Sequence, residues 1–201
     1  MPVAVDGRRR LAPEERKRLL LMYAVEVFSR RGIGRGGHTD IAEIGGVSVA
    51  TVFNYFKTRE ALVNDVLAEI AEFMINTADQ AFADQASPLQ GIRNYFQQFL
   101  RSCEEQPDYI KVWLEWSSSP REEVWPQYLS LQVELLELLT ERIEASIKAG
   151  ELKPGLPASE RARWALGNCQ MLSGMMFDPM GKPEDMDEML DRALNHLLQA
   201  A

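Results

Sequence analysis

The sequence contains few of the residues that build metal centres and disulfide frameworks. Among 201 residues there are two cysteines, Cys103 and Cys169, and two histidines, His38 and His196. The cysteines are far apart and show no CxxC spacing, which favours free thiols in a reducing compartment over a disulfide or a structural metal. We therefore expect neither a metal nor a cofactor.

Long apolar runs are also missing. No stretch approaches the ~20 apolar residues that a membrane-spanning helix requires. The first residues place arginines after a short apolar stretch, which is the reverse of a secretory signal. The content of 46% hydrophobic and 26% charged residues is typical of a globular chain. We expect a cytoplasmic protein of one or two domains, without a membrane partner.

Strand signals are scarce, because no segment alternates apolar and polar residues between hairpin turns. Helical spacing is found nearly everywhere instead, which predicts an all-α fold. A first helix should begin at Pro13 and end near Gly32. Its buried side would carry Leu20, Ala24, Val27 and Phe28.

Two short helices are predicted next, within residues 39 to 56. Thr39 with Asp40 would open the first of them, and Gly45-Gly46 would end it because glycine adopts the left-handed conformation without steric cost. Ser48 would cap the second helix. Its predicted buried stripe is Val49, Val52, Phe53 and Phe56, and its opposite face carries Ala50, Thr51, Asn54 and Tyr55.

Several later helices have clear start and stop signals. Thr58 would cap a fourth helix, and Pro88 and Pro107 would each start another. The run from Ser119 to Glu122 has the spacing of a capping box for a long helix that ends at Gly150 and Pro154. Two final helices are predicted over about 158–177 and from about 183 onward. Their many apolar positions make them candidates for a dimer surface, the alternative being that they cover the monomer core.

Charge divides the chain into two parts. The total is −8, but residues 1–66 hold 11 Lys and Arg against 8 Asp and Glu, a net of +3. The rest of the chain carries −11. A basic first part suits a polyanionic partner, although a solvated basic face is an equally ordinary explanation. Its basic residues include Arg8, Arg9, Arg10, Arg16, Lys17, Arg18, Arg30, Arg31 and Arg35.

Two short helices joined by a glycine-containing turn are typical of a helix-turn-helix, whose second helix enters the DNA major groove. The outer face of the predicted second helix has no acidic group that phosphates would repel. Asn54 could pair bidentately with adenine, and Ala50 could touch a thymine methyl. Tyr55 and Lys57 suit phosphate contacts. The alternative is an ordinary helical hairpin with a polar outer face.

Three possible enzyme or metal motifs are set aside. The run from Gly32 to Gly37 satisfies GxGxxG, but a helix precedes it and no parallel sheet follows, so it is not a dinucleotide site. His38, Asp40 and Glu43 are too few for a metal site and lack a nucleophile. The serines 117–119 form a linker without a partner histidine. We therefore expect no enzymatic activity.

The residues from Arg31 to Leu62, with the runs GIGRGGH, DIAEI and VSVATVFNYF, resemble the DNA-binding domain of TetR-family regulators. They are most similar to the branch of LuxR/HapR-type quorum-sensing master regulators. The block KVWLEWSSSPREEVWP, from Lys111 to Pro126, resembles the core domain of that branch. The resemblance implies a nine-helix subunit, dimerised through its last two helices, with two DNA-binding heads on one palindromic operator.

The domains implied are a basic N-terminal arm over 1–12, a helix-turn-helix domain over 13–66 and a dimerisation and ligand-binding domain over 67–201. The arginine arm resembles an extension that follows the minor groove in this branch. The expected partners are double-stranded DNA and a second copy of the chain, in the cytoplasm at the nucleoid. The DNA-binding residues expected are Arg8, Arg9, Arg10, Thr39, Ser48, Ala50, Thr51, Asn54, Tyr55 and Lys57.

A small hydrophobic ligand is a further possible partner, since TetR-like proteins usually sense ligands between core helices. The residues expected to line such a pocket are Phe96, Phe99, Trp113, Trp116, Cys169 and Leu172, although the same cluster could be ordinary core packing. The LuxR/HapR-type branch often acts through its own abundance. A regulator that activates or represses genes, a ligand-gated local repressor and a helical protein-interaction module without a DNA role thus remain as alternatives.

Overall fold

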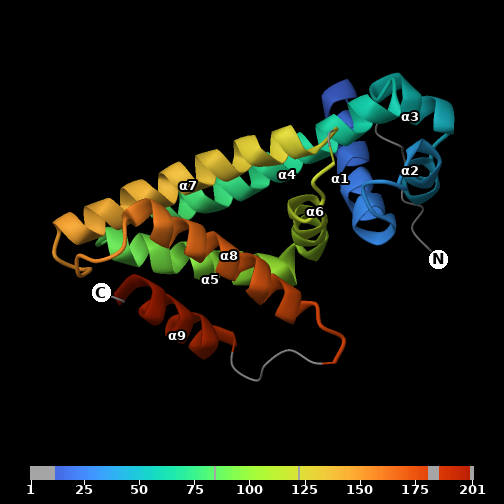
Figure 1. Ribbon diagram of the computed structural model, residues 1–201. Coiled ribbons are helices and arrows are strands. Elements are labelled where there is room, and N and C mark those ends of the chain that lie inside the picture. The colour runs from blue at the N-terminus through green and yellow to red at the C-terminus, as the bar shows by residue number, and fades with distance from the viewer. Residues whose placement is uncertain (1–11, 84, 122, 181–185, 200–201) are drawn as a thin grey trace, which may run out of the picture. The chain divides into compact units, whose positions relative to one another are not determined.

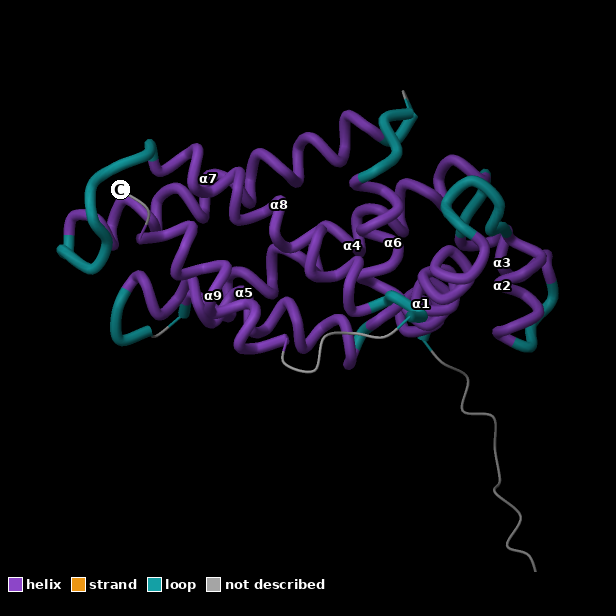
Figure 2. The backbone as a smooth tube through the Cα atoms, turned by 60° about the horizontal axis from the view of Figure 1, so that its bottom comes forward, coloured by secondary structure: helices purple, strands orange, loops and turns teal. Residues whose placement is uncertain are grey.

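The computed structural model describes residues 12–83, 85–121, 123–180 and 186–199, and the side chains of 196–199 are not described. Within these ranges the chain forms α-helices joined by loops and turns, without a strand (Figure 1, Figure 2). The all-α prediction is confirmed. The helices are α1 Pro13–Arg31, α2 His38–Gly45, α3 Val49–Tyr55, α4 Arg59–Phe82, α5 Pro88–Glu105, α6 Pro107–Ser117, α7 Trp125–Lys148, α8 Ala158–Met176 and α9 Met186–Gln199.

Most helix boundaries follow the punctuation of the sequence. Pro13, Pro88 and Pro107 are each the first residue of a helix, where the missing N–H of proline costs no hydrogen bond. The predicted cap at Thr58 is present, because its Oγ1 accepts a hydrogen bond from the Ala61 N–H at 3.0 Å. The helix at 158–177 is also where it was expected.

The long helix does not begin at the predicted capping box from Ser119 to Glu122, of which Glu122 lies outside the described residues. α7 begins only at Trp125, with Pro126 in its first turn. The Ser119 N–H is bonded instead to the Trp116 carbonyl at 3.1 Å, so Ser119 belongs to the turn that ends α6. The Trp116 indole N–H then donates to the carbonyl of Val124 at 2.9 Å, which fixes the approach to α7.

The chain divides into two compact units after Val66, within α4. In the first unit, α1 packs on α2 and α2 packs on α3. The predicted buried residues of α1 are all in its core, together with residues of α2, α3 and α4. These core residues are Leu20, Ala24, Val27, Phe28, Ile41, Val52, Phe56 and Leu62.

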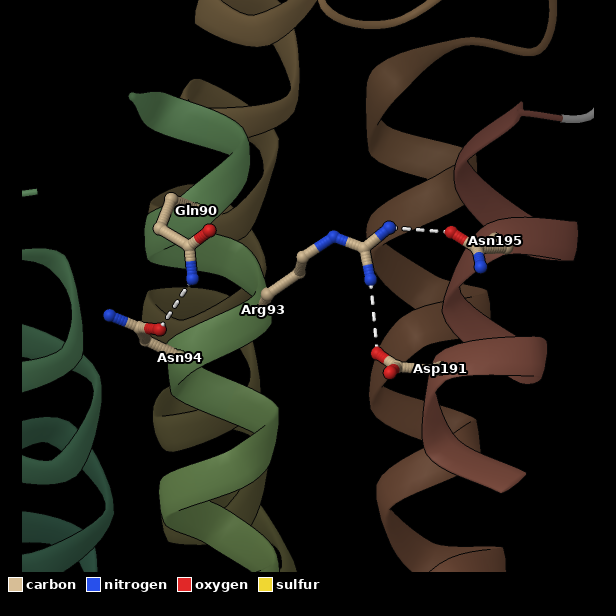
Figure 3. A network of polar contacts seen from close by, with 5 residues as sticks. All are labelled: Gln90, Arg93, Asn94, Asp191 and Asn195. Carbon is tan, nitrogen blue, oxygen red and sulfur yellow. Dashed lines mark hydrogen bonds and ion pairs between the residues drawn. The ribbon is translucent and has the colours of Figure 1, made fainter. Parts of the chain in front are cut away.

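In the second unit α7 and α8 lie side by side, and α5 packs against both (Figure 1). α9 packs on α8 and α5. Its link to α5 is polar: the Arg93 guanidinium forms an ion pair with Asp191 at 3.0 Å and donates a hydrogen bond to the Asn195 side chain (Figure 3). Among the described helices, no segment has the length and apolar composition of a membrane span.

Candidate nucleic-acid interface

The turn between α2 and α3 is built on glycine. Gly46 has φ 58° and ψ 36°, a left-handed conformation that other residues adopt only with strain. Its N–H bonds to the carbonyl of Glu43, and the next N–H, of Val47, bonds to the carbonyl of Ala42 at 3.1 Å. These two bonds close α2 and turn the chain sharply toward α3. α2 begins at His38, one residue before the predicted start at Thr39.

α3 is capped by Ser48, as predicted. The Ser48 Oγ accepts the Thr51 N–H at 3.1 Å and lies 2.8 Å from the Thr51 hydroxyl. On the outer side of α3, Ala50 and Asn54 are exposed, while Thr51 and Tyr55 are half-buried. The outer face therefore presents a methyl group and an amide side by side.

The predicted buried stripe of α3 is half wrong. Val52 and Phe56 are buried, but Val49 is 37% exposed and Phe53 is 44% exposed. α3 has only seven residues, and the narrow side that carries Val52 and Phe56 is enough to pack it against the first unit. Phe53 instead lies flat against the ring of His38, with ring centroids 3.9 Å apart and planes 8° apart.

The other predicted DNA-binding residues lie at the start of α2, after α3 and in the N-terminal arm. Thr39 is exposed in the first turn of α2, and Lys57 is exposed directly after α3. The arm residues Arg8, Arg9 and Arg10 lie outside the described residues. The predicted DNA-binding residues that the structure describes therefore lie on α2, on α3 and in the turns beside α3.

The loop between α1 and α2 is held by a side chain of α4 that the sequence did not indicate. The Arg59 guanidinium donates to the carbonyl of Ile33 at 2.6 Å and to that of Gly36 at 3.3 Å. A Cβ on Gly36 would lie 2.8 Å from a ring carbon of Phe28, so this loop packs too tightly for a side chain there. The run GIGRGGH could have signalled a fixed loop, but its partner Arg59 is distant in sequence.

Acidic neighbours neutralise part of the basic charge of the first unit. Lys17 pairs with Asp65 at 2.9 Å and Arg30 pairs with Glu26 at 2.6 Å. Arg35 and Lys57 are exposed, and neither lies in any of the described salt bridges. The electrostatic attraction to phosphates is therefore weaker at α1 than the count of basic residues suggests.

The predicted ligand-pocket residues are buried in the second unit, and the rings of Phe99 and Trp113 meet edge to face with centroids 5.5 Å apart. Phe96, Phe99, Trp116, Cys169 and Leu172 are all buried. Trp113 alone of the six predicted residues lines a cavity of about 190 Å³ between α7 and α8. Apolar walls from Leu131, Leu135 and Leu166 and polar groups of Gln132, Arg163 and Gln170 complete much of its lining.

Residues 20–66 match the model of the family described as bacterial regulatory proteins, tetR family. The HTH-type transcriptional regulator LuxR of Vibrio harveyi is 41% identical over 150 residues, which cover 75% of this chain and 73% of LuxR. Two solved structures have the same fold at low sequence identity. The regulator FadR of Bacillus subtilis in complex with stearoyl-CoA has a TM-score of 0.75 and 17% identity, and the match covers 92% of this chain and 98% of FadR.

AibR in complex with isovaleryl coenzyme A and operator DNA also has a TM-score of 0.75, with 16% identity and coverage of 91% of this chain and 98% of AibR. The predictions of a helix-turn-helix transcription regulator and of similarity to LuxR are confirmed. The chain therefore belongs to the TetR family of bacterial regulatory proteins, and it is a DNA-binding transcription regulator rather than an enzyme.

Proposed function

We propose that the protein binds a palindromic operator as a homodimer and that each α3 enters the major groove. The observation that carries the proposal is the outer face of α3, where Ala50 and Asn54 are exposed side by side. The chain has no Asp or Glu between Glu43 and Glu60, so this segment meets phosphates without repulsion. A helix of this composition can approach base edges closely.

The proposed contacts follow from the chemistry of each side chain. The amide of Asn54 pairs bidentately with an adenine, and the methyl of Ala50 touches a thymine methyl. The Thr51 hydroxyl is hydrogen-bonded to the Ser48 hydroxyl, so Thr51 contacts a base through its methyl group or through this pair of hydroxyls. Tyr55, Lys57 and Thr39 contact the phosphate backbone and set the register. The arm over 1–12 places one of Arg8, Arg9 and Arg10 in the minor groove.

A second copy of the chain is the proposed partner of the second unit. Trp164 and Met171 are 60% and 48% exposed, and they lie on one side of α8 because seven residues make two helical turns. Leu129 and Val133 are exposed one turn apart on the neighbouring α7. An apolar face of this kind is usually covered by a partner.

We propose a smaller contribution of α9 to this face, on the basis of its described residues. The exposed residues over 186–195 are polar: Asp187, Glu188, Asp191, Arg192 and Asn195. Asp191 and Asn195 are also committed to Arg93 of α5 within the same chain. We therefore place α8 and the adjoining side of α7 at the centre of the two-fold interface, with α9 at its margin.

The resemblance to LuxR supports a role in the quorum-sensing branch, as an activator of some genes and a repressor of others. We propose that the protein works in the cytoplasm, bound to the nucleoid. A second candidate is a ligand-gated local repressor. The observation that favours it is the cavity of about 190 Å³ between α7 and α8, in a fold shared with structures that contain acyl-CoA ligands.

The experiment that tests the proposal is selection of bound fragments from random DNA. We expect an imperfect palindrome with half-sites about one helical turn apart, ~34 Å. Asymmetric sites, or no enriched sequence, would contradict the proposal. Adding an acyl-CoA to the selected complex separates the two candidates: release of DNA supports the ligand-gated repressor, and unchanged binding supports control by abundance.

A further inference from the structure

We propose that His38 is a positioning residue for base recognition. It fixes the position of α3 against α2 and the rotation of α3 about its axis, and thereby the direction of the Asn54 side chain. The inference rests on the proposed role of α3 as the recognition helix. His38 is the first residue of α2 and is buried. Its Nε2 lies 2.7 Å from the carbonyl oxygen of Phe56, and because a carbonyl only accepts, Nε2–H is the donor.

The bonded carbonyl has a particular place in the helix. Phe56 is the C-terminal cap of α3, with φ −120° and ψ 95°, outside the helical region. The last carbonyls of a helix have no partner within the helix itself. The His38 side chain satisfies one of them from α2, so the two helices of the motif are joined by a buried hydrogen bond beyond the turn that connects them.

The same imidazole makes a second contact with α3. Its plane stacks on the ring of Phe53, with centroids 3.9 Å apart. Phe53 is three residues before Phe56, about one helical turn away. One side chain thus contacts α3 at two points, a ring on one turn and a backbone oxygen on the next. Two such contacts resist both sliding of α3 along its axis and rotation about it.

His38 is itself held in place. The Gly37 N–H donates to the carboxylate of Asp40 at 3.0 Å, which closes the first turn of α2, and Arg31 pairs with the same carboxylate at 3.2 Å. Arg59 holds the carbonyls of Ile33 and Gly36 just before it. Side chains of α1 and α4 therefore hold the α1–α2 loop and the start of α2 in place. His38, at that start, in turn holds α3.

Asn54 follows Phe53 directly and is exposed. A bidentate amide contact requires correct distance and orientation at once, so a small rotation of α3 weakens it more than it weakens a phosphate contact. Loss of His38 should therefore reduce discrimination between bases and affect binding to nonspecific DNA much less. A histidine that only fills the core would affect both equally, through stability.

The test uses the full-length protein and the operator found by selection. Two Kd values are measured: one for the intact operator and one for an operator in which one adenine contacted by Asn54 is replaced. The quantity compared between variants is the second Kd divided by the first. We expect His38→Ala to reduce this ratio about tenfold, toward the value for Asn54→Ala. Affinity for random DNA should change less than about twofold. Val25→Ala, which shortens a buried side chain of α1, is the control for stability alone and should keep the ratio.

Further variants separate the two contacts. His38→Phe keeps a flat ring against Phe53 but no donor, and His38→Gln keeps a donor without the ring; each should give an intermediate ratio. In the Asn54→Ala background, His38→Ala should have little further effect on the ratio, because the two residues act on one contact. If His38→Ala fails to fold, the Phe and Gln variants decide.

An unchanged ratio in all folded His38 variants would overturn the inference, as would equal weakening on operator and random DNA. An additive effect in the Asn54→Ala background would also overturn it. Failure of the unmodified protein to prefer any sequence would instead contradict the proposed function of α3, so the two failures are distinguishable.

Discussion

At the scale of single residues, the Tyr95 hydroxyl is a polar group in the core of the second unit that the packing does not satisfy. Tyr95 is buried, and within the described part of the chain its hydroxyl has no hydrogen-bond partner. Burial, reinforced by Cys169, raises the pKa of Tyr95 well above its ordinary value of 10.0. A buried hydroxyl without a partner costs about 1 to 3 kcal/mol of stability.

Tyr95→Phe should therefore leave the free energy of unfolding unchanged or raise it by about 1 kcal/mol near neutral pH. Its advantage should widen above pH 10.0, the ordinary pKa of tyrosine. In the native protein Tyr95 keeps its proton while the unfolded chain loses it, so the native protein loses stability as pH rises and the variant lacks that loss. Urea unfolding at neutral and at alkaline pH measures both effects.

Tyr128→Phe is the matched control. The Tyr128 hydroxyl accepts a hydrogen bond from Gln170 at 3.4 Å, so its removal should lower the free energy of unfolding. If Tyr95→Phe proves as destabilising as Tyr128→Phe, the Tyr95 hydroxyl forms a hydrogen bond in the folded protein, which contradicts the prediction.

Residue exposure on α3 shows where sequence periodicity is informative. The exposure of Ala50 and Asn54 and the burial of Val52 follow from the helical period. The exposure of Phe53 does not, because it depends on the ring of His38, fifteen positions earlier. A stack between two elements leaves no periodic trace in either of them.

At the scale of helices, prolines and glycines predicted most boundaries because their effects are local. Pro13, Pro88 and Pro107 are each the first residue of a helix, and the left-handed Gly46 ends α2. The start of α7 could not be predicted in this way. It depends on the bond from the Trp116 indole to the Val124 carbonyl, a contact between elements.

The apolar face on α7 and α8 leads to a prediction about assembly. Trp164→Glu places a charge at the centre of the proposed two-fold interface, where each copy would face its equivalent. We expect the variant to sediment as a monomer at concentrations where the unmodified protein is a dimer. Its affinity for the palindrome should fall, because the two heads no longer bind as one unit.

Met22→Glu is the control for this variant. Met22 is also a large exposed apolar residue, but it lies on α1 in the first unit. This variant should remain a dimer. A dimeric Trp164→Glu protein would exclude α8 as the centre of the interface.

At the scale of the whole molecule, the overall charge of −8 conceals a basic first part and an acidic remainder. The net negative charge is therefore compatible with DNA binding by the first part. The fold and the helix-turn-helix could be predicted from sequence, since both depend on periodicity and caps. The cavity between α7 and α8 could not be predicted, because it depends on how two helices pack. Trp113 is the one residue that it shares with the six predicted for a ligand pocket.

The variant Asn54→Ala shows whether the outer face of α3 reads bases. Competition binding should compare the selected operator, the operator with single adenines replaced, and random DNA. Lys57→Gln is the matched control, because a lost phosphate contact should weaken binding to all three DNAs alike and reduce its salt dependence.

For Asn54→Ala we expect a loss of discrimination of about 1 to 3 kcal/mol at one adenine in each half-site. Binding to random DNA should be nearly unchanged, since an amide that pairs with a base adds little to the electrostatic attraction to phosphates. Equal weakening on the operator and on random DNA, with every base preference retained, would contradict the claim.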